Sequence, residues 1–125
     1  MRFTVFQFIA SDQAIDHLNT VGWAGDFSAY PELAIQRDVS FRGGSAKFEP
    51  WMFDHYYVVA NIKYARGLED VFHIGNGYGD QSQLERVAPR MHSLSVGDIV
   101  LCHDTNTYYM CDPEGWTAVN IREAA

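Results

Sequence analysis

The residues best suited to chemistry gather around two cysteines near the end of the chain. Cys102, His103 and Asp104 are followed closely by Cys111 and Asp112. Zinc takes such ligands, usually from tight turns such as C-x-x-C. Here a turn separates the cysteines, so only one hairpin register would pair them for a metal site or a disulfide. Alternation places His103 opposite Cys102. We therefore expect two buried structural thiols, with no metal and no cofactor.

Other motifs give no catalytic constellation. Gly75, Gly77 and Gly79 form a G-x-G-x-G run, but a phosphate-binding loop needs a strand before it and a helix after it. This run follows a predicted helix, so we interpret it as a cap and turn. Asp98 follows Gly97 at a strand start, where a carboxylate typically caps turn amides. We predict no catalytic residue, although a site assembled from distant residues would be invisible in the sequence.

One stretch mixes cations with aromatic rings, which is typical of surfaces that bind single strands or nucleotides. The alternatives are a binding loop for a protein or nucleotide, and a solvated loop with apolar anchors. The candidate binding residues are Arg37, Phe41, Arg42, Lys47 and Trp51. A second question concerns aromatics that either mark an interface or complete the core. These are Trp23, Tyr30, Trp51 and Tyr78.

Composition restricts the class of protein. The chain has 125 residues, the size of one domain over residues 1–125, and 47% of them are hydrophobic. The net charge of -7 repels phosphate backbones, so nucleic acid is a less favoured partner than protein. Two cysteines are too few for a disulfide scaffold, and no leader or membrane-spanning stretch is recognisable. We expect a cytoplasmic protein with no membrane partner.

The first half predicts a strand, a helix and a long loop. Residues 2–9 are apolar on both faces, which indicates a central strand covered on two sides. Ser11 or Asp12 caps a helix that runs to Asn19. Its predicted buried stripe is Ala14, Ile15 and Leu18. Residues 24–50 have no clear period, so we expect a long loop broken by a short helix from Pro31.

The second half predicts strands around one helix. Residues 56–65 are rich in β-branched and aromatic residues and indicate a strand. A helix over 68–74 has Leu68, Val71 and Phe72 at the spacing of one buried face. Three short strands separated by turns, at 98–103, 108–111 and 116–121, predict a C-terminal β-meander. The expected fold is α+β: a mostly antiparallel sheet with one to three packed helices.

Two segments support a resemblance when taken together. They are YYVVANIKYARGLEDVFHIGN (56–76) and HSLSVGDIVLC (92–102), the latter followed by Tyr109-Met110-Cys111 and Gly115-Trp116. The pair resembles small proteins of phages and mobile elements of bacteria and archaea, some labelled YodL-like, over about residues 56–121. The resemblance implies a genetic setting rather than a reaction.

From the resemblance, the charge and the missing catalytic motif, we expect a non-enzymatic accessory protein of a phage or mobile element. It would act in the host cytoplasm by binding a host or viral protein, for instance as an inhibitor of a host system. The alternative is a nucleic-acid or nucleotide-binding module that uses residues 37–48.

Overall fold

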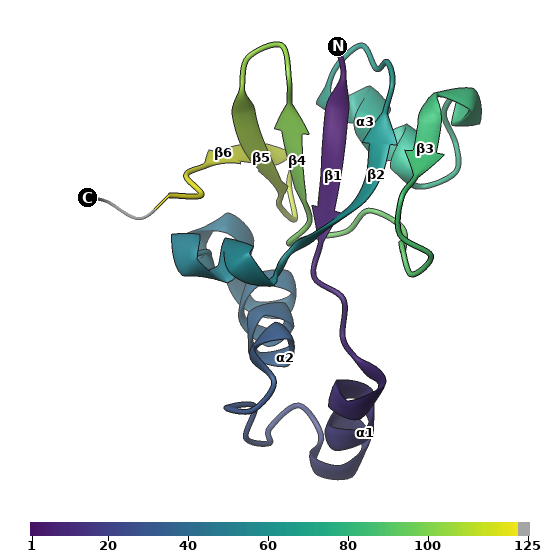
Figure 1. The fold of residues 1–125 in the computed structure, drawn as a ribbon. Coiled ribbons are helices and arrows are strands. Elements are labelled where there is room, and N and C mark those ends of the chain that lie inside the picture. The colour runs from purple at the N-terminus through teal and green to yellow at the C-terminus, as the bar shows by residue number, and fades with distance from the viewer. Residues whose placement is uncertain (123–125) are drawn as a thin grey trace.

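The structure, a computed structural model, describes residues 1–122. Its centre is a six-stranded antiparallel sheet in the order β3-β2-β1-β4-β5-β6 (Figure 1). The strands are β1 (Phe3–Gln7), β2 (Tyr57–Ile62), β3 (Leu84–Arg86), β4 (Ile99–Cys102), β5 (Thr107–Cys111) and β6 (Trp116–Val119). The predicted central strand, the C-terminal meander and the α+β class are confirmed.

One face of the sheet is covered by α3 (Leu68–Gly75). Val71 and Ile74 pack there against Phe3, Val5 and their neighbours on β2 and β4. The prediction placed Phe72 on this buried face, and that is wrong, because 37% of Phe72 is exposed. The buried face is centred on Val71 and Ile74, which are three residues apart, so Phe72 lies at its margin.

The other face is partly covered by irregular helical turns. These are the π-helix η1 (Gln36–Gly43) and two 3₁₀ segments, η2 (Gly44–Lys47) and η3 (Pro50–His55). This layer packs against Ile99 and Met110 of the sheet. The packing residues are Val39, Met52 and, directly after η3, Tyr56. A further 3₁₀ turn, η4 (Gln81–Gln83), precedes β3.

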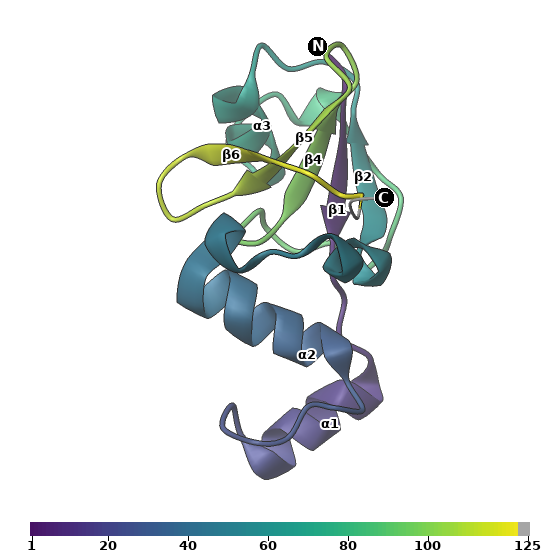
Figure 2. The same ribbon diagram turned by 90° about the vertical axis from the view of Figure 1, so that its left-hand side faces the viewer.

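Residues 11–43 form an arm that projects beyond one end of the sheet (Figure 2). The arm consists of α1 (Asp12–Val21), a connection, α2 (Pro31–Ile35) and η1, which continues α2 directly. The prediction of a loop holds for residues 24–30, which connect α1 to α2, and the short helix from Pro31 is confirmed, but a loop over 36–47 is wrong. The π and 3₁₀ turns that replace it lack the 3.6-residue period by which a sequence indicates a helix.

A small cluster of its own holds the arm together. Ala14 of α1, Phe27 of the connection and Leu33 of α2 are buried against each other. No helix within residues 1–122 is long and apolar enough to cross a membrane.

Candidate functional site: the arm and its groove

The outer side of α1 is only partly covered. Ser11 caps the helix, as predicted, because its Oγ accepts a hydrogen bond from the Ala14 amide at 3.1 Å. Of the predicted buried stripe, Ala14 is buried and Leu18 is half-buried, but Ile15 is 42% exposed. The prediction for Ile15 is wrong because too little of the molecule packs on that side of α1.

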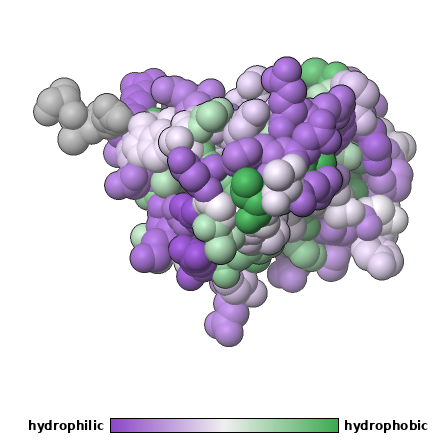
Figure 3. All heavy atoms as spheres, turned by 90° about the horizontal axis from the view of Figure 1, so that it is seen from below, coloured by the Kyte–Doolittle hydropathy of each residue, from purple (hydrophilic) through white to green (hydrophobic). Residues whose placement is uncertain are grey.

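A groove of about 370 Å³ lies beside this uncovered side. Ile15 and Leu18 of α1 line it together with Leu33 of α2 and Trp23 of the connection. The remaining lining residues are Phe8, Ile9, Ala10, Gln36, Arg90 and His92. The view from below shows apolar side chains gathered in the middle of this end of the molecule and framed by polar ones (Figure 3).

Aromatic rings extend the apolar surface from the groove to η1. The ring of Trp23 meets Phe41 edge-on at 5.0 Å between centroids and Phe27 at 5.9 Å. Phe41 is 61% exposed and Trp23 is 37% exposed. Of the four aromatics in question, Trp23, Trp51 and Tyr78 are exposed and Tyr30 is half-buried. Trp23 and Phe41 therefore form one exposed aromatic pair on the arm.

The predicted basic stretch is divided, and one carboxylate pairs with two of its three cations. Asp38 pairs with Arg37 at 3.0 Å and with Arg42 at 3.7 Å. The guanidinium carbon of Arg37 also lies 5.4 Å from the centre of the Phe27 ring, so this side chain makes a cation–π contact within the arm. The five predicted binding residues do not form one cationic face.

The rest of that stretch faces elsewhere. Arg42 and Lys47 line a separate hollow of about 400 Å³, which also contains Asp38 and Glu49. Trp51 stands on η3, and its Nε1 donates a hydrogen bond to Glu49 at 2.7 Å. Two carboxylates beside two cations make this hollow a poor site for phosphate.

The charges left over on the arm are acidic. Asp12 of α1 pairs with Arg90 at 3.0 Å, and the arm's own arginines are held by Asp38. Within residues 1–122, Asp16, Asp26 and Glu32 have no lysine or arginine at ion-pair distance. The arm is therefore acidic as a whole, with five acids and two arginines over residues 11–43, whereas the ionic side chain that lines the groove itself is Arg90.

A buried polar cluster fixes the wall of the groove that contains His92. Gln7 at the end of β1 is fully buried. Its Nε2 donates to Asp98 Oδ2 at 3.0 Å and to the His92 carbonyl at 2.9 Å, while its Oε1 accepts from the His92 amide at 3.2 Å. Asp98 Oδ2 also accepts from the Ser95 amide at 2.9 Å, so the predicted capping role of Asp98 is confirmed.

Asp98 is unusual because it is a carboxyl group with 1% exposure. Burial raises its pKa to about 7, and the nearby His92, with Nδ1 at 4.0 Å from Oδ2, opposes that rise. Within the described residues, its Oδ1 has no hydrogen-bond partner. His92 Nδ1 lies 2.8 Å from the backbone oxygen of Ser93, and no serine hydroxyl bonds to the ring in residues 1–122. At 4.0 Å the His92 ring and the Asp98 carboxyl group are not hydrogen-bonded to each other, and the ring activates no serine.

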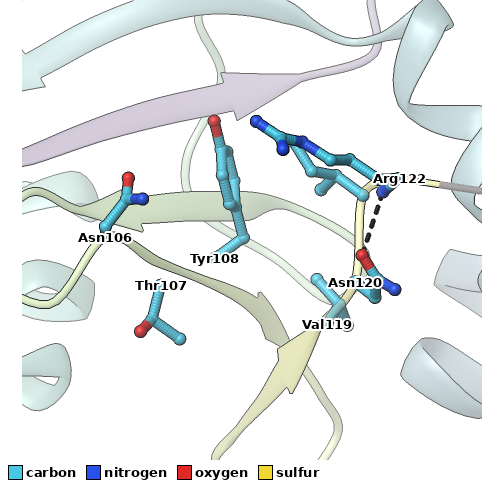
Figure 4. A pocket seen from close by; sticks show the side chains of 7 residues that line it. Asn106, Thr107, Tyr108, Val119, Asn120 and Arg122 are labelled. Atoms are coloured by element: carbon cyan, nitrogen blue, oxygen red, sulfur yellow. Dashed lines mark hydrogen bonds between the residues drawn. The ribbon is translucent and has the colours of Figure 1, made fainter.

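A second hollow of about 380 Å³ lies between β5 and the end of the chain (Figure 4). The side chains of Asn106, Tyr108 and Arg122 line it, and Arg122 donates its backbone amide to Asn120 Oδ1 at 3.0 Å. Val119 and Ile121 also line it, so polar and apolar groups contribute about equally to its walls.

The region of the cysteines is structural in this fold. Cys102 pairs across the hairpin with Thr107, and Cys111 pairs with Trp116, so the register does not bring the cysteines together. Both are free and buried, and burial raises the pKa of Cys111 to about 11. His103 points away from Cys102 and bonds to Thr4 Oγ1 at 2.7 Å. In residues 1–122 no three histidine, cysteine or acidic side chains converge on a possible metal position.

The sequence predicted Ile15 and Leu18 as buried residues and did not indicate that they line a groove. It also gave no role to His92 or to Gln7, which holds His92 and Asp98 in place. The available signal was a polar residue at an inward position of β1 together with an acid in the turn before β4. Comparison with family models, with curated proteins and with solved structures gives no match for this chain.

Proposed function

We propose that this chain is a non-enzymatic binding protein that holds a protein partner on the arm. The proposal includes the setting expected above: an accessory protein of a phage or mobile element that acts on a host or viral protein in the host cytoplasm. One observation carries the binding role. Ile15 and Trp23 line a groove and the Trp23 ring contacts that of Phe41, so these three exposed apolar residues belong to one stretch of surface.

Two further features support a protein partner. Exposed aromatic rings are the residues most enriched at the centres of protein interfaces. The arm also contains an eight-residue π-helix, a rare conformation that is found frequently at functional sites. The nucleic-acid alternative over residues 37–48 has less support, because Asp38 pairs with both Arg37 and Arg42 and Glu49 lies in the same hollow as Arg42 and Lys47.

Site-specific crosslinking tests the proposal. A photoreactive phenylalanine analogue replaces Phe41 in one variant and Tyr64 in a matched control. Tyr64 is 54% exposed and precedes Ala65, whose amide donates a hydrogen bond to the Met1 carbonyl just before β1, whereas the arm follows the other end of β1. A protein trapped from position 41 but not from position 64 is then purified and mixed with the unmodified chain.

We expect saturable binding of that purified protein, with at least about tenfold loss for Ile15→Ser or Phe41→Ser and no change for Tyr64→Ser. Equal trapping from both positions, or binding that survives both arm substitutions, would contradict an interface on the arm.

A further inference from the structure

A small hollow apart from the arm lies between α3 and the turn that joins β5 to β6. Its volume is about 170 Å³, which is below the range of pockets that hold a whole drug-sized ligand and suits a single head group or side chain. Two aromatic residues, two acidic residues and three further residues of the β5–β6 connection form its walls: Phe72 and Trp116, Glu69 and Asp112, and Cys111, Pro113 and Gly115.

Short-range features of two elements bring these side chains together. Glu69 and Phe72 are three residues apart on α3, so they lie on one side of the helix. In the turn, the Asp112 amide donates a hydrogen bond to the Gly115 carbonyl at 2.9 Å, and Gly115 takes a φ of 75°, which favours glycine. The chain therefore reverses tightly, and Trp116 enters β6 beside the same hollow as Asp112.

The ionic side chains in these walls are both negative. Within residues 1–122, neither Glu69 nor Asp112 has a lysine or arginine at ion-pair distance, and Arg66, just before α3, pairs with a different acid of that helix. The Asp112 carboxylate is held by neutral donors, which are the Ser45 amide and hydroxyl and the Thr117 hydroxyl. These bonds fix its position without cancelling its charge, so the hollow attracts a cation.

The aromatic rings and the state of the carboxylate decide which cation fits. Cations bind to the negative faces of aromatic rings, most strongly at tryptophan, and quaternary ammonium groups are typical ligands of sites that combine rings in this way. The Asp112 oxygens already accept three hydrogen bonds, so they offer charge more than free acceptors. This combination favours a cation that has no N–H groups to satisfy over lysine or arginine, which carry several donors.

We infer that this hollow binds a quaternary ammonium group, with the methyl groups against the two rings and the charge facing the two carboxylates. The group can belong to a free small cation or to a trimethylated lysine side chain, which share this chemistry. The hollow shares no lining residue with the groove on the arm, so the inference is independent of the proposed function.

Choline and its uncharged isostere 3,3-dimethylbutan-1-ol test the inference, because the two differ in charge at nearly constant shape. Each is titrated into the full chain and followed by the indole N–H signals in ¹H–¹⁵N spectra. The signal of Trp116, assigned with a Trp116→Phe variant, reports on the hollow. Those of Trp23 and Trp51, which do not line the hollow, are internal references.

We expect choline to shift the Trp116 signal saturably and to leave the Trp23 and Trp51 signals unchanged. Choline should bind at least about tenfold more tightly than the isostere at low salt, because the isostere fills the same space without the charge.

Matched variants separate the charge from the ring. Glu69→Gln should weaken choline about two- to fivefold, while Glu114→Gln, which changes an exposed acid of the turn outside the hollow, should not. Phe72→Leu keeps an apolar side chain without the ring and should also weaken binding, whereas Tyr64→Leu should not.

A peptide with trimethyllysine between glycines and serines distinguishes the two sources. Binding at least as tight as that of choline assigns the site to a modified side chain of a protein, and weaker binding assigns it to a free small cation. Three results would overturn the inference: no saturable shift of Trp116 with choline or the peptide, equal binding of the isostere and choline, or equal binding of the peptide with unmodified lysine.

Discussion

Two opposing effects act on the pKa of the buried Asp98 carboxyl group. Its burial favours the neutral acid, while the hydrogen bonds from Gln7 and the Ser95 amide favour the carboxylate. The raised pKa of about 7 means that burial is the larger effect. In the unfolded chain the same group titrates near 3.8. The folded state therefore holds a proton that the unfolded state has already lost in the range between these two values.

The sign of the pH dependence follows from that difference. The contribution of Asp98 to stability is complete below pH 3.8 and is lost as the pH rises through about 7. We predict that Asp98→Asn, which keeps an acceptor for Gln7 and Ser95, removes this loss. Urea unfolding between pH 5 and 8 should show the wild type losing up to about 1.4 kcal/mol per pH unit relative to the variant. Parallel curves for the two proteins would contradict the prediction.

Single residues also show what the sequence could predict at this scale. The cap at Ser11 and the turn role of Asp98 were predictable because each depends on neighbours within three residues. The partners of Gln7 were not predictable, because its side-chain amide bonds to His92 and Asp98, which are distant in sequence. A sequence indicates that an inward glutamine needs a partner but does not identify which one.

Among the three α-helices of residues 1–122, α1 buries the fewest residues. It buries only Ala14, and at its N-terminus the Ser11 hydroxyl oxygen accepts a hydrogen bond from the Ala14 amide. We predict that Ser11→Ala costs about 1 kcal/mol of local helix stability, because an N-terminal amide loses its acceptor. Amide hydrogen exchange should accelerate over residues 12–21 and stay unchanged in β1 and β4. Equal acceleration in the sheet would mean that α1 does not open independently.

A different element, η2, is attached to the meander by one carboxylate. Asp112 accepts hydrogen bonds from the Ser45 amide at 2.7 Å, from the Ser45 hydroxyl at 2.6 Å and from the Thr117 hydroxyl. These bonds lower its pKa despite the opposing effect of desolvation. We predict that Asp112→Ala lowers the free energy of unfolding by about 2 kcal/mol, measured by urea unfolding at pH 7.

Two comparisons make the Asp112 prediction specific. Asp104→Ala, in the exposed turn before β5, is the matched control and should change little. The stability difference between the wild type and the Asp112→Ala variant should also shrink as the pH falls below the ordinary carboxyl range, because the lowered pKa makes the charged form the stabilising one.

The elements differ in how readable they were. Runs of apolar and β-branched residues predicted every strand except β3, which has three residues and was missed, and a regular period predicted α3. Residues 31–47 were misread as mostly loop, because π and 3₁₀ turns have no characteristic period in sequence. Ile15 was misplaced for another reason: periodicity gives the apolar side of a helix but does not show whether anything covers that side.

At the scale of the whole molecule, the arm concentrates apolar surface at one end. We predict that Ile15→Ser combined with Phe41→Ser reduces the fluorescence of a bound apolar dye while changing the free energy of unfolding by less than about 0.5 kcal/mol per site. The reason is that both side chains are largely solvent-exposed and support little of the core. Tyr64→Ser is the comparison, and an equal loss of fluorescence there would show that the dye does not report on the arm.

The order of the strands has a consequence for synthesis. Phe3 of β1 pairs with Ile62 of β2 and with Cys102 of β4. β1 therefore leaves the ribosome well before β4, and their pairing has to wait until the intervening residues have been made. Such distant pairings slow folding relative to helical bundles. During that interval the apolar N-terminal strand is exposed, which makes the nascent chain a natural client for chaperones.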